Sequence, residues 1–326
     1  RPFLIVAVLS LMLSFSALYL GKTAVLIFSL FITVLFFVLF LTNKKLLIKM
    51  VVPLLFLIFA IVGAFYSINA SERAEALPEK LTVKGIVTEA PVIYENGQSF
   101  VLRVASLNTK AFVFSSNLYD IKAGDRVTAL ISINPQGSYK WTNYSKGIYI
   151  NSFLQDIKEI ETPDFSVYRV VANYRSYIEQ TIFSKASDKN APILIALSTG
   201  NKGYINPVDQ KHINNCGVSH IMSVSGLHLG IICLSLVKFF KKLKSSDKIV
   251  SVAGIISMTL VVAACGFQIS AIRAAIAYLI LFLGDLIKRK GEGLNSLCVA
   301  ITLIVATNPF VIGSVSFLLS VSATFG

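Results

Sequence analysis

The apolar and polar positions divide the chain into an apolar first part, a polar middle part and an apolar last part. A membrane-spanning helix needs about 20 mostly apolar residues in a row. Three such runs precede residue 71, at 2–20, 24–42 and 46–68. We therefore predict that residues 1–70 form three transmembrane helices.

The middle part, residues 71–165, has the pattern of a small β domain. Alternation of apolar with polar side chains, in runs rich in Val, Ile, Phe and Thr, indicates half-buried strands. Five such runs lie at 81–89, 99–107, 110–116, 126–134 and 147–160. Five short strands in so short a segment favour a barrel of OB type over a small sandwich.

Residues 166–222 are expected to form amphipathic and interfacial helices. Apolar residues between 163 and 186 fall close to one helical face, and Thr162 with Pro163 is the predicted start of that helix. The segment APILIALSTG at 191–200 is apolar but too short to span a membrane. We expect Gly200 to end its helix.

Residues 223–326 return to long apolar runs, which predict a helical transmembrane domain. The runs lie at 224–240, 249–267, 269–287, 294–307 and 310–326. Because the chain begins without Met and stops inside the last run, we expect a fragment of a longer protein. The predicted fold class is an α-helical polytopic membrane protein with an inserted small all-β extracytoplasmic domain, an OB-like barrel.

Composition excludes a soluble domain as the whole of this chain. Hydrophobic residues make up 55% of it and charged residues 14%, whereas soluble domains average about 25% charged residues. The net charge of +13 does not identify a nucleic-acid surface, because residues 71–165 hold ten basic and eleven acidic side chains. The four Cys have no CxxC spacing, so neither a disulfide framework nor a metal site is predicted.

Basic clusters next to the apolar runs predict how the chain crosses the membrane, because cytoplasmic loops carry an excess of Lys and Arg. Three clusters, within 44–49, 238–248 and 288–290, fall on one side when the predicted spans alternate in direction. Residues 71–222 then lie on the other side. We therefore predict a multi-pass membrane protein whose residues 71–222 are extracytoplasmic.

The stretch HIMSVSGLHLG at 220–230 places two His and two Ser at the start of an apolar run. One interpretation is an intramembrane serine hydrolase that uses Ser225 with His228 or His220. A pair three residues apart on one helix is poorly aimed for attack, and the two His lack a metal-ligand spacing. We favour two other interpretations, a polar lining of a pathway through the membrane, or contacts with water and a neighbouring helix.

Arg273 lies four residues into the predicted span 269–287. An arginine at the centre of a membrane helix costs about 2.5–3.5 kcal/mol on insertion scales. Snorkelling to the membrane surface would relieve that cost. The alternative is an inward-facing guanidinium that binds phosphate through two parallel hydrogen bonds.

Aromatic residues of the middle part, with basic residues between them, suit the stacking of bases, although the near-neutral charge of this part does not predict strong electrostatic binding of nucleic acid. We expect about half of the aromatic rings in the barrel core. The candidate DNA contacts of the β domain are Arg103, Lys110, Phe112, Lys140, Trp141 and Tyr144.

Several motifs resemble those of the ComEC family of competence proteins. HIMSVSGLHLG at 220–230 resembles the family's H-L-L-A-I-S-G-L-H-V-G, and LIALSTGNK at 194–202 is similar to its L-x-A-L-L-T-G-D-K. CGVSH, ISAIRA, LSVSATFG and NPQGSYKWTNYSKGIY resemble further family motifs in the same order along the chain. Departures are Asn201 for Asp, Ser223 for Ala and Ile269 for Pro.

The resemblance implies a channel component that imports single-stranded DNA across the bacterial cytoplasmic membrane during natural transformation. The residues that it implies for the DNA pathway are His220, Ser223, Ser225, Gly226, His228, Arg273, Thr199 and Lys202. The implied partners are single-stranded DNA, the lipid bilayer, a DNA receptor outside and a DNA translocase inside, and a homo-oligomer stays open.

No cofactor, metal or catalytic residue is predicted. The H-x-H-x-D-H motif of the nuclease domain in longer family members is absent from this sequence, so we do not expect an enzyme. The rival classes are the serine hydrolase and a transporter of a small anion.

Overall fold

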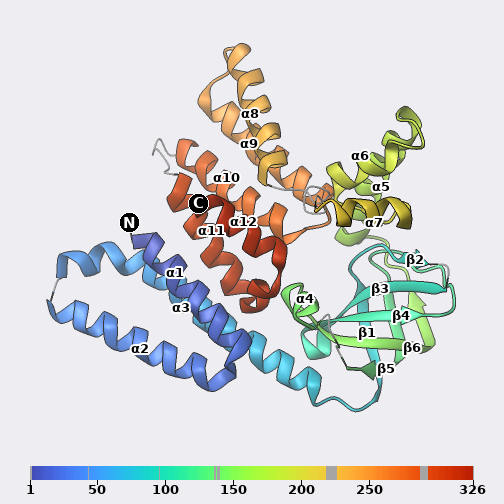
Figure 1. Cartoon of the computed structure of the whole chain (residues 1–326), viewed down its shortest axis with the longest axis horizontal. Helices are drawn as coiled ribbons and strands as arrows, with labels where there is room; N and C mark the ends of the chain where they lie inside the picture. Colours follow the sequence, from blue (N-terminus) through green and yellow to red (C-terminus); the bar gives the residue numbers. More distant parts are fainter. Residues whose placement is uncertain are drawn as a thin grey trace.

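The structure is a computed structural model that describes residues 2–42, 44–94, 96–135, 137, 140–217, 226–286 and 293–325. Figure 1 shows a β-barrel at one end of the molecule, the N-terminal helices at the other end, and the remaining helices between and above them. The chain is therefore mostly helical with one inserted barrel.

Three helices precede the barrel: α1 (Pro2–Tyr19), α2 (Gly21–Thr42) and α3 (Lys44–Glu75). They coincide with the three predicted apolar runs. However, α3 continues past the predicted boundary at residue 70 to Glu75, because NASERAE at 69–75 contains neither Gly nor Pro to end the helix. The first part of the predicted β domain is therefore the last turn of a helix.

Two helical segments among the described residues are long and apolar enough to cross a membrane, by length and composition. They are residues 51–75 and 247–264. Shorter apolar helices lie at 3–19, 21–34 and 293–307.

The barrel is closed by five strands: β1 (Lys80–Val87), β3 (Gly97–Val104), β4 (Thr109–Ser115), β5 (Arg126–Asn134) and β6 (Ile148–Glu161). Their order is β1–β5–β6–β4–β3, and β3 pairs again with β1. The β4–β6 pair is parallel and the others are antiparallel. The predicted small barrel is confirmed, and its OB type stays a prediction.

Three short elements among the described residues of the middle part were not predicted. They are β2 (Val92–Tyr94), which pairs with β3, the 3-10 turn η1 (Ala105–Leu107) and the helix α4 (Lys140–Ser145). Periodicity cannot identify them, because none is long enough to show a repeat.

The helices after the barrel lie close to the predicted runs. They are α5 (Val167–Lys185), α6 (Ala191–Thr199), α7 (Pro207–Asn215), α8 (Gly226–Lys242), α9 (Asp247–Ala264), α10 (Ile269–Leu286) and α11 (Gly293–Thr307), followed by the 3-10 turn η3 (Pro309–Gly313) and α12 (Val315–Phe325). The start of α5 was predicted wrongly at Thr162 and Pro163. Strand β6 stays paired with β5 as far as Glu161, so the chain needs the residues up to Ser166 to leave the barrel.

The buried apolar residues form two main cores. The first core joins the barrel to α1, α3 and α11 and includes Leu102, Leu13 and Ile301. The second core lies among α8, α9 and α10 and includes Leu229 and Met258. Because the first core is continuous from barrel to helices, the barrel is packed against the helical part.

The first junction between barrel and helices is made by α4. The side chains of Lys140 and Tyr144 both contact Glu75 Oε1 at the end of α3, at 2.7 Å and 2.8 Å. Asn308 Nδ2 donates to the backbone oxygens of Tyr144 and Ser145, at 2.7 Å and 2.9 Å. Helix α4 is therefore held by α3 on one side and by the turn after α11 on the other.

The second junction is made by α5. The carboxylate of Asp125, before β5, is 2% exposed and accepts from Arg169 Nη2 at 2.5 Å and from Lys122 N at 2.7 Å. Gly124, with φ of +91°, leaves room for Ser166, whose side chain would clash with a Cβ there. Helix α5 thus begins directly against the barrel.

Replacing Asp125 by Ala is expected to destabilise the chain by about 2 kcal/mol, because a hydrogen bond to a charged group contributes about 1.5–3 kcal/mol. The unfolding midpoint of the full chain in detergent, followed by circular dichroism, measures this change. Asp120→Ala is the matched control, since that side chain is 86% exposed. Equal midpoints for the two variants would contradict the proposed role of the Asp125–Arg169 pair.

Candidate functional site

The outer surface of β3 and β4 brings together three of the predicted DNA contacts. Arg103 on β3 lies opposite Lys110 on β4, and Phe112 follows two residues later on the same face. Strand β4 alternates strictly, so that Lys110, Phe112 and Phe114 face outward while Ala111 and Val113 are buried. Arg103 also donates to Tyr168 Oη at 3.3 Å, next to the start of α5.

An aromatic cluster extends this surface past Phe112. Phe114 lies in register with Phe153 of β6, with ring centroids 5.7 Å apart, and Tyr94 of β2 lies 6.4 Å from Phe114. Tyr94 and Phe153 are each about half exposed. Sequence reasoning missed both, because only the strand pairing places them beside Phe114.

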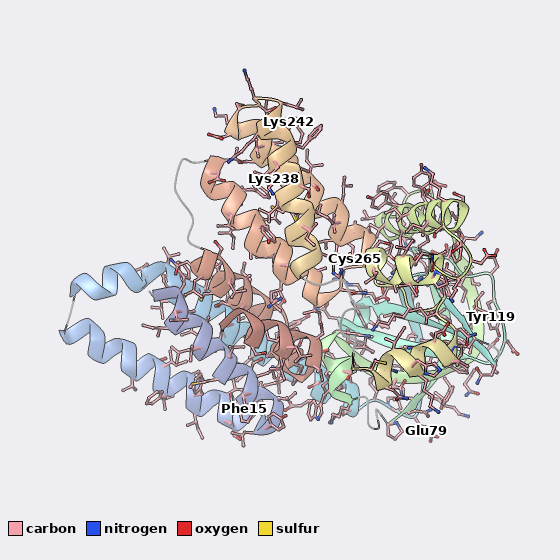
Figure 2. All side chains as sticks on the ribbon, turned by 45° about the horizontal axis from the view of Figure 1, so that its top comes forward. Phe15, Glu79, Tyr119, Lys238, Lys242 and Cys265 are labelled. Atoms are coloured by element: carbon pink, nitrogen blue, oxygen red, sulfur yellow. The ribbon has the colours of Figure 1, made fainter. Side chains whose placement is uncertain are left out.

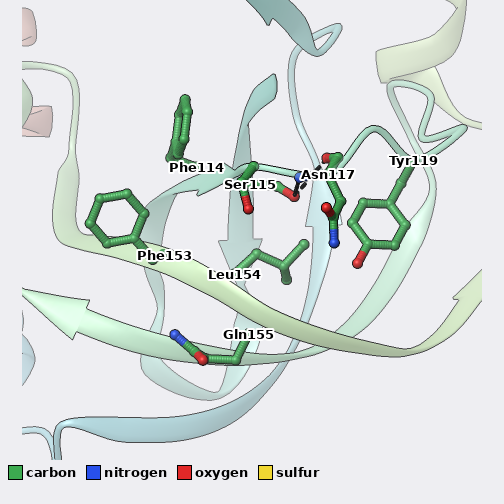
Figure 3. Close-up of a pocket in the computed structure, with 8 residues that line it drawn as sticks. Phe114, Ser115, Asn117, Tyr119, Phe153, Leu154 and Gln155 are labelled. Carbon is green, nitrogen blue, oxygen red and sulfur yellow. Dashed lines mark hydrogen bonds between the residues drawn. The ribbon is translucent and has the colours of Figure 1, made fainter. Parts of the chain in front are cut away.

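A pocket of about 440 Å³ lies at the end of the aromatic cluster (Figure 3). Its walls combine the rings of Phe114, Phe153 and Tyr119 with polar side chains such as Asn117 and Gln155. Flat rings beside amide groups suit an unpaired base, which has both a stacking face and hydrogen-bonding edges.

The three predicted contacts on α4 lie at the junction between the barrel and the helices. Tyr144 is 2% exposed and packs against Tyr149 and Phe310, and burial followed by its hydrogen bond to Glu75 raises the pKa of its hydroxyl. Lys140 is paired with Glu75, and the Trp141 ring contacts both Tyr144 and Phe310. The Tyr144 ring is therefore buried in this structure, and the DNA contacts predicted for these three residues stay predictions.

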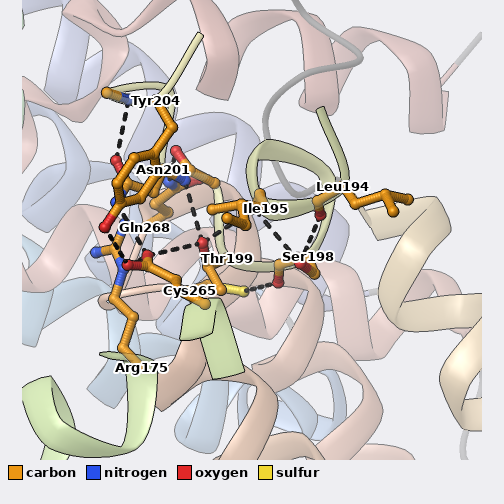
Figure 4. Close-up of polar contacts among 12 residues, drawn as sticks. Arg175, Leu194, Ile195, Ser198, Thr199, Asn201, Tyr204, Cys265 and Gln268 are labelled. Atoms are coloured by element: carbon orange, nitrogen blue, oxygen red, sulfur yellow. Dashed lines mark hydrogen bonds and ion pairs between the residues drawn. The ribbon is translucent and has the colours of Figure 1, made fainter. Parts of the chain in front are cut away.

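A buried carboxylate organises the region between the barrel and helices α9 and α10. Glu179 of α5 is 6% exposed, and its Oε1 accepts from Arg175 Nε at 3.1 Å, Asn201 Nδ2 at 2.9 Å and Thr199 Oγ1 at 3.3 Å. Its Oε2 accepts from Tyr204 Oη at 3.1 Å. Figure 4 shows these four donors converging from α5, the end of α6 and the loop that follows.

The local sequence explains why the donors meet. Helix α6 ends at Thr199 because Gly200 adopts a left-handed φ of +72°, which confirms the predicted cap. Helix α7 begins at Pro207, where the side chain of Asn206 accepts from Val208 N. The short loop between these two helix ends carries Asn201 and Tyr204 back to Glu179.

The same segment lies against the turn between α9 and α10. Gln268 Nε2 donates to Gly200 O at 3.2 Å, and Cys265 Sγ donates to Ser198 O at 3.7 Å (Figure 4). A Cβ on Gly266 would lie 2.7 Å from Arg175 Nη1. The end of α6 is therefore fixed next to the first turn of α10.

Arg273 lies in α10 at the boundary of the two cores. It is 4% exposed, and its Nε and Nη1 have no hydrogen-bond partner in the described part of the chain. It shares a helical face with Ile269 and Ile276, which pack against the first core, whereas Ala274 belongs to the second. We call this face of α10 the seam.

No carboxylate within the described parts of α8 to α12 compensates Arg273. The acids of residues 226–286 and 293–325 are Asp247, at the far end of α9, and Asp285. Asp285 is twelve residues along α10, or about 18 Å at the helical rise. An unpaired buried cation is costly unless an anion joins it.

The other residues that were predicted for the DNA pathway do not all lie on one surface of the described structure. His220, Ser223 and Ser225 lie outside the described residues, and Gly226 begins α8 with His228 part-buried in its first turn. Thr199 is fully buried and bonded to Glu179, so it does not lie on an accessible surface.

Lys202 lies in the loop that Glu179 organises. Its side chain is part-buried, and this burial lowers the pKa of its ammonium group. It comes directly after Asn201, whose amide donates to Glu179.

The comparisons with known proteins point to one class. Residues 197–326 match the family model described as "Competence: Competence protein", and this segment includes both the polar loop after α6 and Arg273. The match supports a relationship to competence proteins and does not favour the serine hydrolase.

One known protein is also similar to part of this chain. ComE operon protein 3 of Bacillus subtilis (strain 168) is 24% identical over 182 residues, which cover 56% of this chain and 23% of that protein. The match thus spans about a quarter of the length of the curated relative. No solved structure matches the chain.

Proposed function

We propose that this chain is a channel component that passes a single strand of DNA across the bacterial cytoplasmic membrane during natural transformation. The observation that carries the proposal is Arg273, a buried cation without a counter-charge among the described residues, inside the segment that matches competence proteins. A phosphodiester is the anion that a DNA strand would bring to it.

The arrangement of the helix ends supports a multi-pass membrane topology. Glu75 and Asn308 contact α4, next to the barrel, and Gln268 contacts the end of α6. Lys238 and Lys242 lie on the part of α8 that points away from the barrel (Figure 2). Lysines at the opposite end from the barrel fit a barrel outside the cell and basic loops inside it.

The barrel is the proposed site of first contact with DNA. The parallel pairing of its third strand, β4, with its last strand, β6, and the closure of β1 on β3 suit an OB-type barrel, in which the second and third strands bind oligonucleotides. Those two strands carry Arg103, Lys110, Phe112 and Phe114 on their outer surface. Basic groups would follow the sugar-phosphate backbone while bases stack on the rings.

Replacing Phe112 and Phe114 together by Ala is expected to weaken binding of a fluorescent oligothymidylate at least about tenfold, because base–aromatic stacking contributes about 1–3 kcal/mol per base. Fluorescence anisotropy with the full chain in lipid nanodiscs measures the affinity. Tyr177→Ala is the matched control, since Tyr177 is an aromatic residue on α5 that is 69% exposed. Unchanged affinity in the double variant would contradict the proposed surface.

The proposal assigns no catalytic step to this chain. Its partners would be single-stranded DNA and other competence proteins, a receptor outside and a translocase inside, and self-association is tested by cross-linking in membranes. Labelling of Ser225 by a serine-directed fluorophosphonate would favour the hydrolase instead. DNA import by cells that depend on this chain, measured as nuclease-protected label, tests the function directly.

A further inference from the structure

We propose that Glu179 is a positioning residue, which holds the 198–202 segment against the turn before α10 and so sets the place of the helix that carries Arg273. The positioning itself is independent of the proposed function. Its effect on DNA import rests on that function.

The first step of the argument is the chemistry of Glu179. A buried carboxylate is tolerated only when hydrogen bonds replace its lost water. Here Arg175 comes from its own helix, whereas Thr199, Asn201 and Tyr204 come from 20 to 25 residues further along the chain. One side chain therefore ties the end of α6 and the following loop to α5.

The second step is the contact of this segment with the turn between α9 and α10. Ser198 O and Gly200 O accept from Cys265 and Gln268, which lie on either side of Gly266. Gly266 has a φ of +61° and faces Arg175, the same arginine that bonds Glu179. A shift of the Glu179 contacts would therefore move the turn from which α10 begins.

The third step is the connection to the barrel. Helix α5 is pinned to Asp125 through Arg169 and to the α6 loop through Glu179. These two positions are ten residues apart, or about 15 Å along the helix. A single helix thus fixes the distance between the barrel and the start of α10.

A ligand site is the alternative role for such a cluster, and the contacts argue against it. Each carboxylate oxygen already accepts from protein donors, with Tyr204 on one and three groups on the other. The described residues contain no group of three or more His, Cys, Asp or Glu that could hold a metal ion. Burial, and then the nearby Glu179 charge, raises the pKa of the Tyr204 hydroxyl, so it stays a donor.

The native cysteines provide the test. Cys265 is fully buried at the contact with Ser198, Cys298 is fully buried in α11, and Cys216 is exposed. In membranes that contain the full chain with Cys216→Ser, the alkylation rates of Cys265 and Cys298 are measured by mass spectrometry with N-ethylmaleimide. Cys265 reports the proposed contact and Cys298 reports general loosening.

Glu179→Ala is expected to accelerate alkylation of Cys265 about tenfold or more, because four donors lose their acceptor and the contact opens locally. The rate at Cys298 should stay within about twofold of the wild type, since global opening is not required. Gln180→Ala, an exposed neighbour on α5, is the matched control and should change neither rate.

A milder variant keeps the proposal testable if Glu179→Ala fails to fold. Asn201→Ala removes one donor to Glu179 and should accelerate Cys265 alone, and this effect should vanish in the Glu179→Ala background because the two residues act through one contact. An unchanged Cys265 rate, equal acceleration of Cys298, or additive effects of the two substitutions would each overturn the proposal.

The alkylation test of Glu179 can be decided independently of the DNA-import test. If the wild-type chain imports DNA, import should fall in both variants in the same order as the Cys265 rates rise. If the wild-type chain imports none, the proposed function fails, and the Cys265 rates still decide whether Glu179 positions the turn.

Discussion

Replacing Arg273 by Met is expected to reduce DNA import about tenfold to a hundredfold, since a hydrogen bond to a charged group contributes about 1.5–3 kcal/mol and about 1.4 kcal/mol is a factor of ten. The same variant is expected to raise the stability of the chain. Arg273 is 4% exposed, and two of its nitrogens lack partners within the described residues. A Met of similar length removes that buried charge and keeps the packing of the seam.

A fall in DNA import together with a rise in stability would distinguish a binding role of Arg273 from a structural one. If Arg273 only supported the fold, both import and stability would fall together. Import is measured as nuclease-protected labelled DNA, and stability as the unfolding midpoint in detergent. Lys238→Met, on the exposed side of α8, is the control and should alter neither quantity. Normal import by a normally inserted Arg273→Met chain would remove the main support for the proposed function.

Arg273→Lys separates charge from geometry. A lysine keeps the positive charge but cannot form the planar, two-pronged contact of a guanidinium with phosphate. We therefore expect import by this variant to lie between that of the wild type and that of Arg273→Met. Its stability should stay near the wild-type value, because the ammonium group is also buried without a partner.

Apolar runs and alternation predicted most of the fold, because they reflect the environment of each residue. The barrel strands began within two residues of their predicted positions, and the helical cap at Gly200 followed from its conformational freedom. The short α4 was missed, and with it the burial of Tyr144. Alternation cannot show that a surface of the barrel is covered by another part of the chain.

The candidate site was less predictable for a related reason. Arg273 stood out in the sequence because a charge in an apolar run is rare. Glu179 did not, because a Glu on an amphipathic helix is ordinary, and its partners Thr199, Asn201 and Tyr204 lie in a different segment. Tyr94 and Phe153 likewise became part of a surface only through strand pairing with β3 and β4.

The face of α10 that we call the seam lies where the two cores meet. Helices α8, α9 and α10 pack around the second core, while α11 packs with α1 and α3 in the first. Among the described residues, α10 contributes side chains to both cores, and Arg273 lies on that part of the helix. A pathway along this boundary would separate two packed groups of helices without opening either core, which is the smaller energetic cost.

The first core depends on a close approach of α3 and α11 at Gly63. A Cβ at this position would lie 1.8 Å from Ala306 O, whereas real Cβ contacts are not shorter than 3.0 Å. Small residues permit such approaches between membrane helices. Gly63→Ala must therefore push the two helices apart, and overpacking of this kind costs about 1–3 kcal/mol. Because Asn308 follows Ala306 by two residues, its bonds to α4 should break as well.

Trp141 makes this prediction measurable, since it is the single Trp of the chain and its ring contacts Tyr144 and Phe310 at the junction. Gly63→Ala should shift its emission to longer wavelength and lower the unfolding midpoint, because water reaches the ring when α4 separates from η3. Gly293→Ala is the matched control, since a Cβ there meets nothing within 4 Å. Unchanged emission in Gly63→Ala would mean that the barrel is held without the α3–α11 contact, and α5 would then be its main attachment.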